Sequence, residues 1–342
     1  MSKPVRHIFR WDLDKTYLRT DFDTVRDLLR TALLKPEQRQ NVPGTGALLR
    51  ALTRPQEDTR VVVTFISGSP EQMRSKIERK FALDGVRPDI FILKPQLRLL
   101  LRGKFRAIRG QVGYKLNALL RVRTKTPLAP ETLFGDDAEQ DAFIYSLYAD
   151  IVSHAISVDR LELILKEAQV YQDTALRILE RAASIEARPT VERIFINLDR
   201  KSPPGQFLVF GPRVVPISDY FQAAVVLYGD GILDARGLFQ VVADMIVEAD
   251  YALTDFGSSF QDIARRGRLP ADLVARLESQ LEQAQLIEGL PAEFEVALLE
   301  RMRSLSPRGE TLQLKWEGPP DYIEILRADA KLREAIEAGT PG

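Results

Sequence analysis

Short apolar runs alternate with amphipathic stretches along the amino-terminal part of the chain. Runs at 7–13, 61–66, 89–94, 132–135 and 193–198 indicate strands that are buried on both faces, as in a parallel sheet. Stretches with helical spacing lie between them, at 25–34, 45–52, 71–81, 112–122 and 141–151. Strands that alternate with helices predict an α/β fold, with a mostly parallel sheet flanked by helices.

The second half of the chain follows a different pattern. Residues 161–187 predict a helical stretch inserted before the last strand, and 206–217 predict an edge hairpin. Helical spacing then dominates, at 238–252, 272–286 and 293–302, and the tail at 319–342 is partly helical. We therefore expect one α/β domain over 1–230, with a helical insert at about 152–190, and a helical carboxyl-terminal region over 231–342.

Composition excludes several classes of chemistry. The 342 residues include no cysteine, and His7 and His154 are the only histidines. Thiolate sites, cysteine nucleophiles, serine triads and multi-histidine metal sites are therefore ruled out or nearly so. Any catalysis must rely on carboxylates, hydroxyls and lysine.

The chain shows no targeting pattern. Its start turns charged almost at once, and no run approaches the roughly 20 apolar residues that span a bilayer. Formal net charge is zero, so no overall field attracts the protein to nucleic acid or membrane. We expect a cytoplasmic protein without a transmembrane segment.

The first predicted strand ends in Asp12-Leu13-Asp14-Lys15-Thr16, at the edge where open α/β sheets bind ligands. Alternate residues leaving a strand point the same way, so Asp12 and Asp14 can flank one phosphoryl group. Asp12 can attack phosphorus to form an aspartyl phosphate, and Asp14 can act as the acid and then the base. A solvated acidic turn is the alternative interpretation of this motif.

The second predicted strand ends in Ser67-Gly68-Ser69-Pro70. The hydroxyl of Ser67 can donate to a phosphoryl oxygen. Ser69 has the pattern of a helix N-cap, with Pro70 at the first helical position. Lys115, placed at the start of a predicted helix, is unfavourable there unless an anion lies nearby.

The fourth predicted strand ends in the acidic turn 135–141, which contains Asp136, Asp137, Glu139 and Asp141. Such a cluster needs a cation or open water. Carboxylates beside a phosphate also require a hard cation with oxygen ligands, and Mg²⁺ fits best. We assign Asp12, Asp14, Asp136 and Asp141 to the metal; an acidic cap on the following helix is the alternative.

These motifs together resemble those of the haloacid dehalogenase superfamily of phosphatases. The set comprises Asp12, Asp14, Thr16, Ser67, Lys115, Asp136 and Asp141. Within that superfamily, three shorter stretches are similar to the actin-patch-associated phosphatidate phosphatase family. They are residues 42–44 before a predicted helix, residues 66–70, and Gly135-Asp136 followed by Asp141. The resemblance covers roughly 5–150 and departs at Lys15, where the family's D-I-D-D-T pattern has a further aspartate.

The resemblance implies a Rossmann-like fold of the haloacid dehalogenase type and a Mg²⁺-dependent phosphatase. It implies that Asp12 is the nucleophile, Asp14 the acid and base, and Asp136 a metal ligand. The expected substrate-binding residues are Thr16, Ser67, Gly68 and Lys115. Phosphatidate or another large anionic phosphomonoester is the expected substrate, and a soluble phosphorylated metabolite is the alternative.

A basic segment follows the third predicted strand. Residues 94–130 contain ten lysines and arginines and no acid, interleaved with leucine and phenylalanine up to 106. This pattern favours peripheral contact of 94–125 with an anionic membrane, although a solvated face paired with acidic helices would look the same. A non-catalytic phospho-accepting or anion-binding module is a further alternative. A nucleic-acid-binding function would leave the acidic motifs unexplained, so we expect no nucleic-acid partner.

Overall fold

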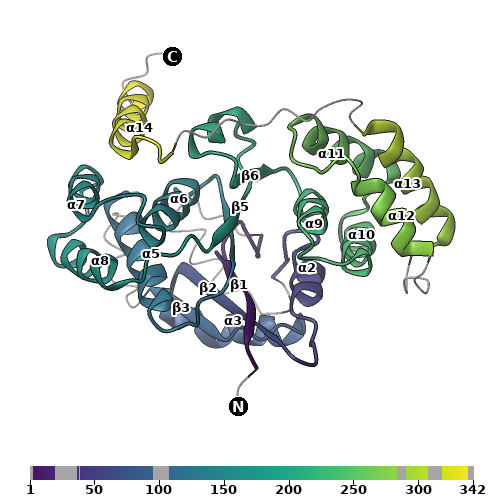
Figure 1. Ribbon diagram of the computed structural model, residues 1–342, viewed down its shortest axis with the longest axis horizontal. Helices are drawn as coiled ribbons and strands as arrows, with labels where there is room; N and C mark the ends of the chain where they lie inside the picture. Colours follow the sequence, from purple (N-terminus) through teal and green to yellow (C-terminus); the bar gives the residue numbers. More distant parts are fainter. Residues whose placement is uncertain are drawn as a thin grey trace.

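A computed structural model describes residues 3–19, 37, 39–94, 108–282, 290–306 and 318–337. Its centre is one six-stranded sheet in which every neighbouring pair is parallel (Figure 1). The strands are β1 (Val5–Trp11), β2 (Arg60–Pro70), β3 (Ile90–Lys94), β4 (Glu131–Asp136), β5 (Val191–Asn197) and β6 (Val214–Ile217). Their order is β3-β2-β1-β4-β5-β6. The predicted α/β fold of Rossmann-like type is confirmed.

Helices cover both faces of the sheet (Figure 1). One apolar cluster joins the sheet to α2 (Thr45–Leu52), α3 (Arg74–Leu83), α9 (Tyr220–Gly229), α10 (Ala235–Ala249), α11 (Leu253–Arg265), α12 (Leu273–Glu282) and α13 (Ala292–Leu305). A second cluster on the opposite face joins it to α5 (Ile108–Arg123), α6 (Asp141–Val152), α7 (Val158–Glu167), α8 (Gln172–Ser184) and α14 (Tyr322–Glu337). Alternation along the strands explains the two layers: Phe195 joins the first cluster, and Ile194 and Ile196 join the second.

A network of charged side chains is buried between the sheet and the helices α5 and α6. Nε of Arg10 lies 2.5 Å from Oε2 of Glu131, and both side chains are almost fully buried. The hydroxyls of Tyr148 and Thr190 donate to Glu131 at 2.9 Å. Nε of buried Arg123 lies 3.7 Å from the same carboxylate. Glu131 therefore faces two buried guanidinium groups.

One prediction beyond the central strands was wrong. The predicted hairpin at 206–217 is a 3₁₀-helix, η3 (Pro204–Phe210), followed by β6, which pairs parallel with β5. Phe207 and Phe210, three residues apart, are buried, because a 3₁₀-helix places such residues on one face. The predicted helical stretch at 161–187 is helical and consists of two helices, α7 and α8. The predicted helix at 25–34 lies outside the described residues.

The final helix returns to the first part of the chain. The ring of Tyr322 in α14 packs edge-on against Phe143 in α6 at a centroid distance of 5.3 Å. Its hydroxyl donates to Oδ2 of Asp150 at 2.5 Å. No described helix is long and apolar enough to cross a membrane.

Candidate active site

The predicted nucleophile Asp12 and the predicted metal ligand Asp136 lie at the neighbouring carboxyl ends of β1 and β4. These central strands are adjacent although their chain positions are far apart, so the crossovers on either side leave in opposite directions. Ligands of open α/β sheets bind at such a switch point, beyond the carboxyl ends of the strands. Asp12 directly follows β1, and its backbone N–H donates to the carbonyl of Phe134 in β4 at 2.8 Å. Asp136 is the last residue of β4.

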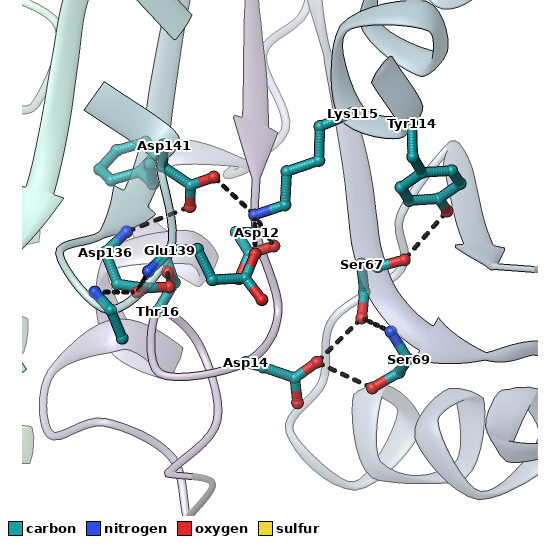
Figure 2. A network of polar contacts seen from close by, with 12 residues as sticks. Asp12, Asp14, Thr16, Ser67, Ser69, Tyr114, Lys115, Asp136, Glu139 and Asp141 are labelled. Carbon is teal, nitrogen blue, oxygen red and sulfur yellow. Dashed lines mark hydrogen bonds and ion pairs between the residues drawn. The ribbon is translucent and has the colours of Figure 1, made fainter. Parts of the chain in front are cut away.

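A lysine lies at the centre of this site. Nζ of Lys115 is 2.8 Å from Oδ1 of Asp12, 2.6 Å from Oε2 of Glu139 and 2.5 Å from Oδ1 of Asp141 (Figure 2). Lys115, Asp12 and Asp141 are almost fully buried. Lys115 was expected at the start of a helix but lies in the middle of α5. The carboxylates, and not a helix end, therefore account for its position.

Burial and like charge raise the pKa values of the acids. For Asp12, desolvation raises the pKa most, attraction to Lys115 lowers it, and Asp141 and Glu139 raise it further, to a value well above the ordinary one. The pKa of Asp136 is raised well above its ordinary value by the same causes, led by burial. Burial opposes the charge of Lys115, but the surrounding carboxylates outweigh it and raise its pKa well above normal. The site has more carboxylates than Lys115 can neutralise.

Asp14 lies across the site, on the side of β2 (Figure 2). Its Oδ2 accepts hydrogen bonds from Oγ of Ser67 at 3.0 Å and from Oγ of Ser69 at 2.8 Å. Burial raises the pKa of Asp14, and the two serine hydroxyls partly oppose that shift. The predicted N-cap role of Ser69 was wrong, because Pro70 precedes η2 (Glu71–Met73) and no side chain caps it.

Asp136 organises the acidic turn. Its Oδ1 accepts the backbone N–H groups of Ala138 and Glu139 at 2.7 and 3.0 Å. Its Oδ2 accepts the hydroxyl of Thr16 at 3.3 Å. Its own N–H donates to Oδ2 of Asp141 at 3.2 Å. The turn therefore holds Glu139 and Asp141 toward Lys115.

The donor set fits a divalent cation. Oxygens of Asp12, Glu139 and Asp141 lie within 4.8 Å of one another. Oδ2 of Asp12 and Oδ1 of Asp14 are buried and have no hydrogen-bond partner in the described part of the chain. Buried carboxylate oxygens without partners, in a site with excess negative charge, are the ligands that Mg²⁺ prefers.

The geometry also shows what sequence reasoning missed. Glu139 stands in the acidic turn but was not assigned to the metal, and Ser69 was given a capping role. Glu139 could have been included from its position in the sequence, because it lies in the same acidic turn, two residues before Asp141. Gly68 has open space where a side chain would extend, and Thr16 is fully buried against Asp136. Substrate contacts for these two residues stay predictions.

Part of the basic segment that carries the membrane prediction, at 95–107, lies outside the described residues. Of its described cations, Lys115 and Arg123 are buried, so neither can reach a membrane surface. Lys94, at the end of β3, lies with Nζ 5.8 Å from the centre of the Tyr114 ring. The Tyr114 hydroxyl donates to the carbonyl of Ser67 at 2.9 Å, which places Lys94 beside the site.

Comparison with known families agrees with this geometry. Residues 11–158 match the model of the family described as phosphatidate phosphatase APP1, catalytic domain. The matched region contains every acidic residue of the site, Lys115 and both serines. The match is consistent with the resemblance to the haloacid dehalogenase superfamily. No curated protein and no solved structure matches the chain. The match identifies a phosphatase domain, that is, a phosphoric monoester hydrolase.

Proposed function

We propose that this chain, whose residues 11–158 belong to the APP1 catalytic-domain family, is a Mg²⁺-dependent phosphatase acting through an aspartyl phosphate on Asp12. One observation carries the proposal. Oδ1 of Asp12 is held by Lys115, whereas the buried Oδ2 has no partner at the ligand-binding edge of the sheet. A carboxylate with one oxygen anchored and the other unpaired is suited to attack phosphorus.

Lys115 supports this attack electrostatically. Its ammonium favours the ionised form of Asp12 against the burial and repulsion that raise the pKa of that carboxyl. The same ammonium can then attract the phosphoryl oxygens as the new bond forms. A bound Mg²⁺, held by Asp12, Asp141 and Glu139 or the predicted Asp136, would neutralise the remaining negative charge and polarise the phosphoryl group.

Asp14 provides the proton transfer. Burial raises its pKa and so favours the protonated form, and its Oδ1 has no hydrogen-bond partner in the described part of the chain. Asp14 can donate a proton to the leaving alcohol oxygen as the P–O bond breaks. The resulting carboxylate can then accept a proton from the water that hydrolyses the aspartyl phosphate. Ser67 and Ser69 keep the other oxygen of Asp14 in place.

Phosphatidate is the substrate that we propose. The matching family is described as a phosphatidate phosphatase, and the site offers Lys94 as a second cation beside Ser67. The basic segment can hold an anionic bilayer near the strand ends, at about 1 kcal/mol per engaged lysine or arginine.

We place the catalytic unit in residues 1–230, with the helical region 231–342 packed against it. We also place the enzyme in the cytoplasm.

The catalytic test uses radiolabelled substrate with and without Mg²⁺. We expect hydrolysis and an acid-stable labelled protein for the wild type, and neither for Asp12→Asn. Full activity of Asp12→Asn would refute the nucleophile, and full activity in EDTA would refute the metal. A soluble phosphomonoester cleaved far faster than phosphatidate vesicles would favour the alternative of a metabolite phosphatase.

The lipid test compares two triple charge reversals. Replacement of Arg98, Arg102 and Arg106 by glutamate should impair hydrolysis of vesicle-borne phosphatidate. Hydrolysis of a small soluble phosphomonoester should be unchanged. The control replaces the exposed Arg236, Arg265 and Arg301 by glutamate, which makes the same charge change far from the basic segment in the sequence. Hydrolysis of both substrates should be unchanged in this control. Equal loss on both substrates in the first variant would count against a membrane role for the segment.

A further inference from the structure

A polar pocket lies at the start of β1, at the opposite end of the strand from the catalytic residues. Its volume is about 310 Å³, within the size of small-molecule sites. Its walls come from the start of β1, the end of α2 and the residues after it, the α9–α10 connection, and α12. Arg6 belongs to this pocket and Asp12 to the active site, six residues along one strand, about 20 Å apart. The two sites are therefore separate.

Three arginines from three elements line this pocket. They are Arg6 on β1, Arg54 after α2 and Arg276 on α12, and Asp234 is the one acidic residue among the lining residues described. Asp234 is already engaged, since its Oδ2 lies 2.7 Å from Arg54 and its Oδ1 accepts the backbone N–H of Gly237. The lining therefore carries an excess of two positive charges. Asp272 lies 3.2 Å from Nε of Arg276, but that pair is solvent-exposed and weakened by screening.

The guanidinium groups retain unused donors. A guanidinium has five N–H bonds. NH2 of Arg6 donates to the carbonyl of Leu52 at 3.1 Å, while its Nε is buried without a hydrogen-bond partner in the described part of the chain. The hydroxyl of Tyr228, whose side chain is only 3% exposed, is likewise buried without such a partner. Unpaired buried donors are costly unless a ligand or water accepts from them.

We propose that this pocket binds a small organic phosphate as a second ligand, distinct from the substrate phosphate at Asp12. Arginine forks match the oxygens of a phosphate group, and a phosphomonoester near neutral pH carries close to the two negative charges that the lining lacks. The pocket volume leaves room for an organic group beyond the phosphate. Bound there, the ligand contacts β1, α2 and α12 together, and so ties the helical carboxyl-terminal region to the catalytic sheet.

The test measures binding of phenylphosphonate, a dianion whose C–P bond a phosphomonoesterase does not cleave. Titration calorimetry in EDTA gives the number of sites and the affinity for the full chain. We expect Arg54→Gln with Arg276→Gln to lose one equivalent of binding per chain, or to weaken it at least tenfold. Arg236→Gln, an exposed arginine on the neighbouring α10, should bind as the wild type does. Turnover of a soluble phosphomonoester should be unchanged in both variants, which separates this pocket from the active site.

Two results would overturn the assignment. One is the same number of sites and affinity in wild type and in the Arg54/Arg276 variant, because binding would then lie elsewhere. The other is binding of phthalate, a dicarboxylate of similar size, at least as tight as that of phenylphosphonate and equally dependent on Arg54 and Arg276. The pocket would then be a carboxylate site. A single arginine substitution, Arg276→Gln alone, repeats the test if the double variant proves unstable.

Discussion

The side chain of Asp141 packs directly against the bare α-carbon of Gly135. A Cβ at residue 135 would lie 2.5 Å from both Cβ and Oδ2 of Asp141, closer than real Cβ contacts. The backbone φ of Gly135 is not positive, so a side chain there is excluded by lack of space and not by backbone conformation. This close contact lets Asp141 reach Lys115 and the backbone N–H of Asp136 at once.

Gly135→Ala should therefore displace Asp141 and lower kcat at least tenfold, since small misplacements of catalytic groups are expensive. Steady-state kinetics at saturating Mg²⁺ measures the loss. Gly205→Ala is the control, because a Cβ there meets nothing within 4 Å. Wild-type kinetics in Gly135→Ala would show that the position of Asp141 is unimportant for turnover.

Lys115→Met should abolish most activity. The substitution keeps an unbranched side chain, one atom shorter, but removes the charge that three carboxylates share. Breaking a buried ion cluster costs about 3–5 kcal/mol of stability, and we expect kcat to fall by about 10²-fold or more. Urea unfolding and phosphatase kinetics report the two effects. Lys125→Met, at an exposed lysine just after the same helix, should leave both unchanged; comparable losses there would argue against a specific role for Lys115.

Removing a hydroxyl beside Asp14 should shift the pH profile. The hydrogen bond from Ser69 lowers the pKa of Asp14, so Ser69→Ala should raise that pKa. If protonated Asp14 is the general acid, the alkaline limb of the kcat profile moves to higher pH in Ser69→Ala. Asp14→Asn should slow turnover by roughly 10²–10⁴-fold. An unmoved limb in Ser69→Ala, with the fold intact, would remove Asp14 from that role.

His7 should make the protein less stable in mild acid. Burial lowers its pKa from 6.5 to about 4, and its Nε2 lies 2.9 Å from Oγ1 of Thr132. The unfolded chain therefore binds a proton more readily, so stability falls as pH drops from about 6.5 to about 4, by roughly 3 kcal/mol. NMR titration of the two histidines tests this directly. In His7→Gln the fall over this range should shrink, and in His154→Gln it should persist.

Glu131→Gln should destabilise the fold by about 3–5 kcal/mol, because Arg10 and Arg123 would stay buried without a counter-charge. Burial opposes ionisation of Glu131, but the nearby arginines lower its pKa below the ordinary value. Its contribution is therefore present above the pKa of the unfolded chain and is lost as pH falls through the lower folded-state pKa. Chemical denaturation at pH 7 measures the loss, with the exposed Glu186→Gln as the reference; equal stability of the two variants would contradict it.

The central strands could be predicted from the sequence because each is a short, nearly continuous apolar run. The helix at 45–52 was predicted with its exact bounds, since its apolar residues follow helical spacing and Gly44 precedes it. Local pattern failed at 206–217, where an apolar run reads equally as a strand or as a short helix. Only packing against the sheet face, which buries Phe207 and Phe210, selected the 3₁₀-helix.

The sequence by itself determined the α/β class, the order of the strand-borne motifs, and that carboxylates and lysine must do the chemistry. Those features follow from periodicity and composition, which are local properties of the chain. Tertiary structure alone decided that Lys115, from the middle of α5, contacts Asp12, Glu139 and Asp141, and that Ser69 serves Asp14 and not a helix end. It also brought Arg6, Arg54 and Arg276 to one pocket. Contacts between residues distant in sequence depend on how helices cross the sheet, and no spacing along the chain records that.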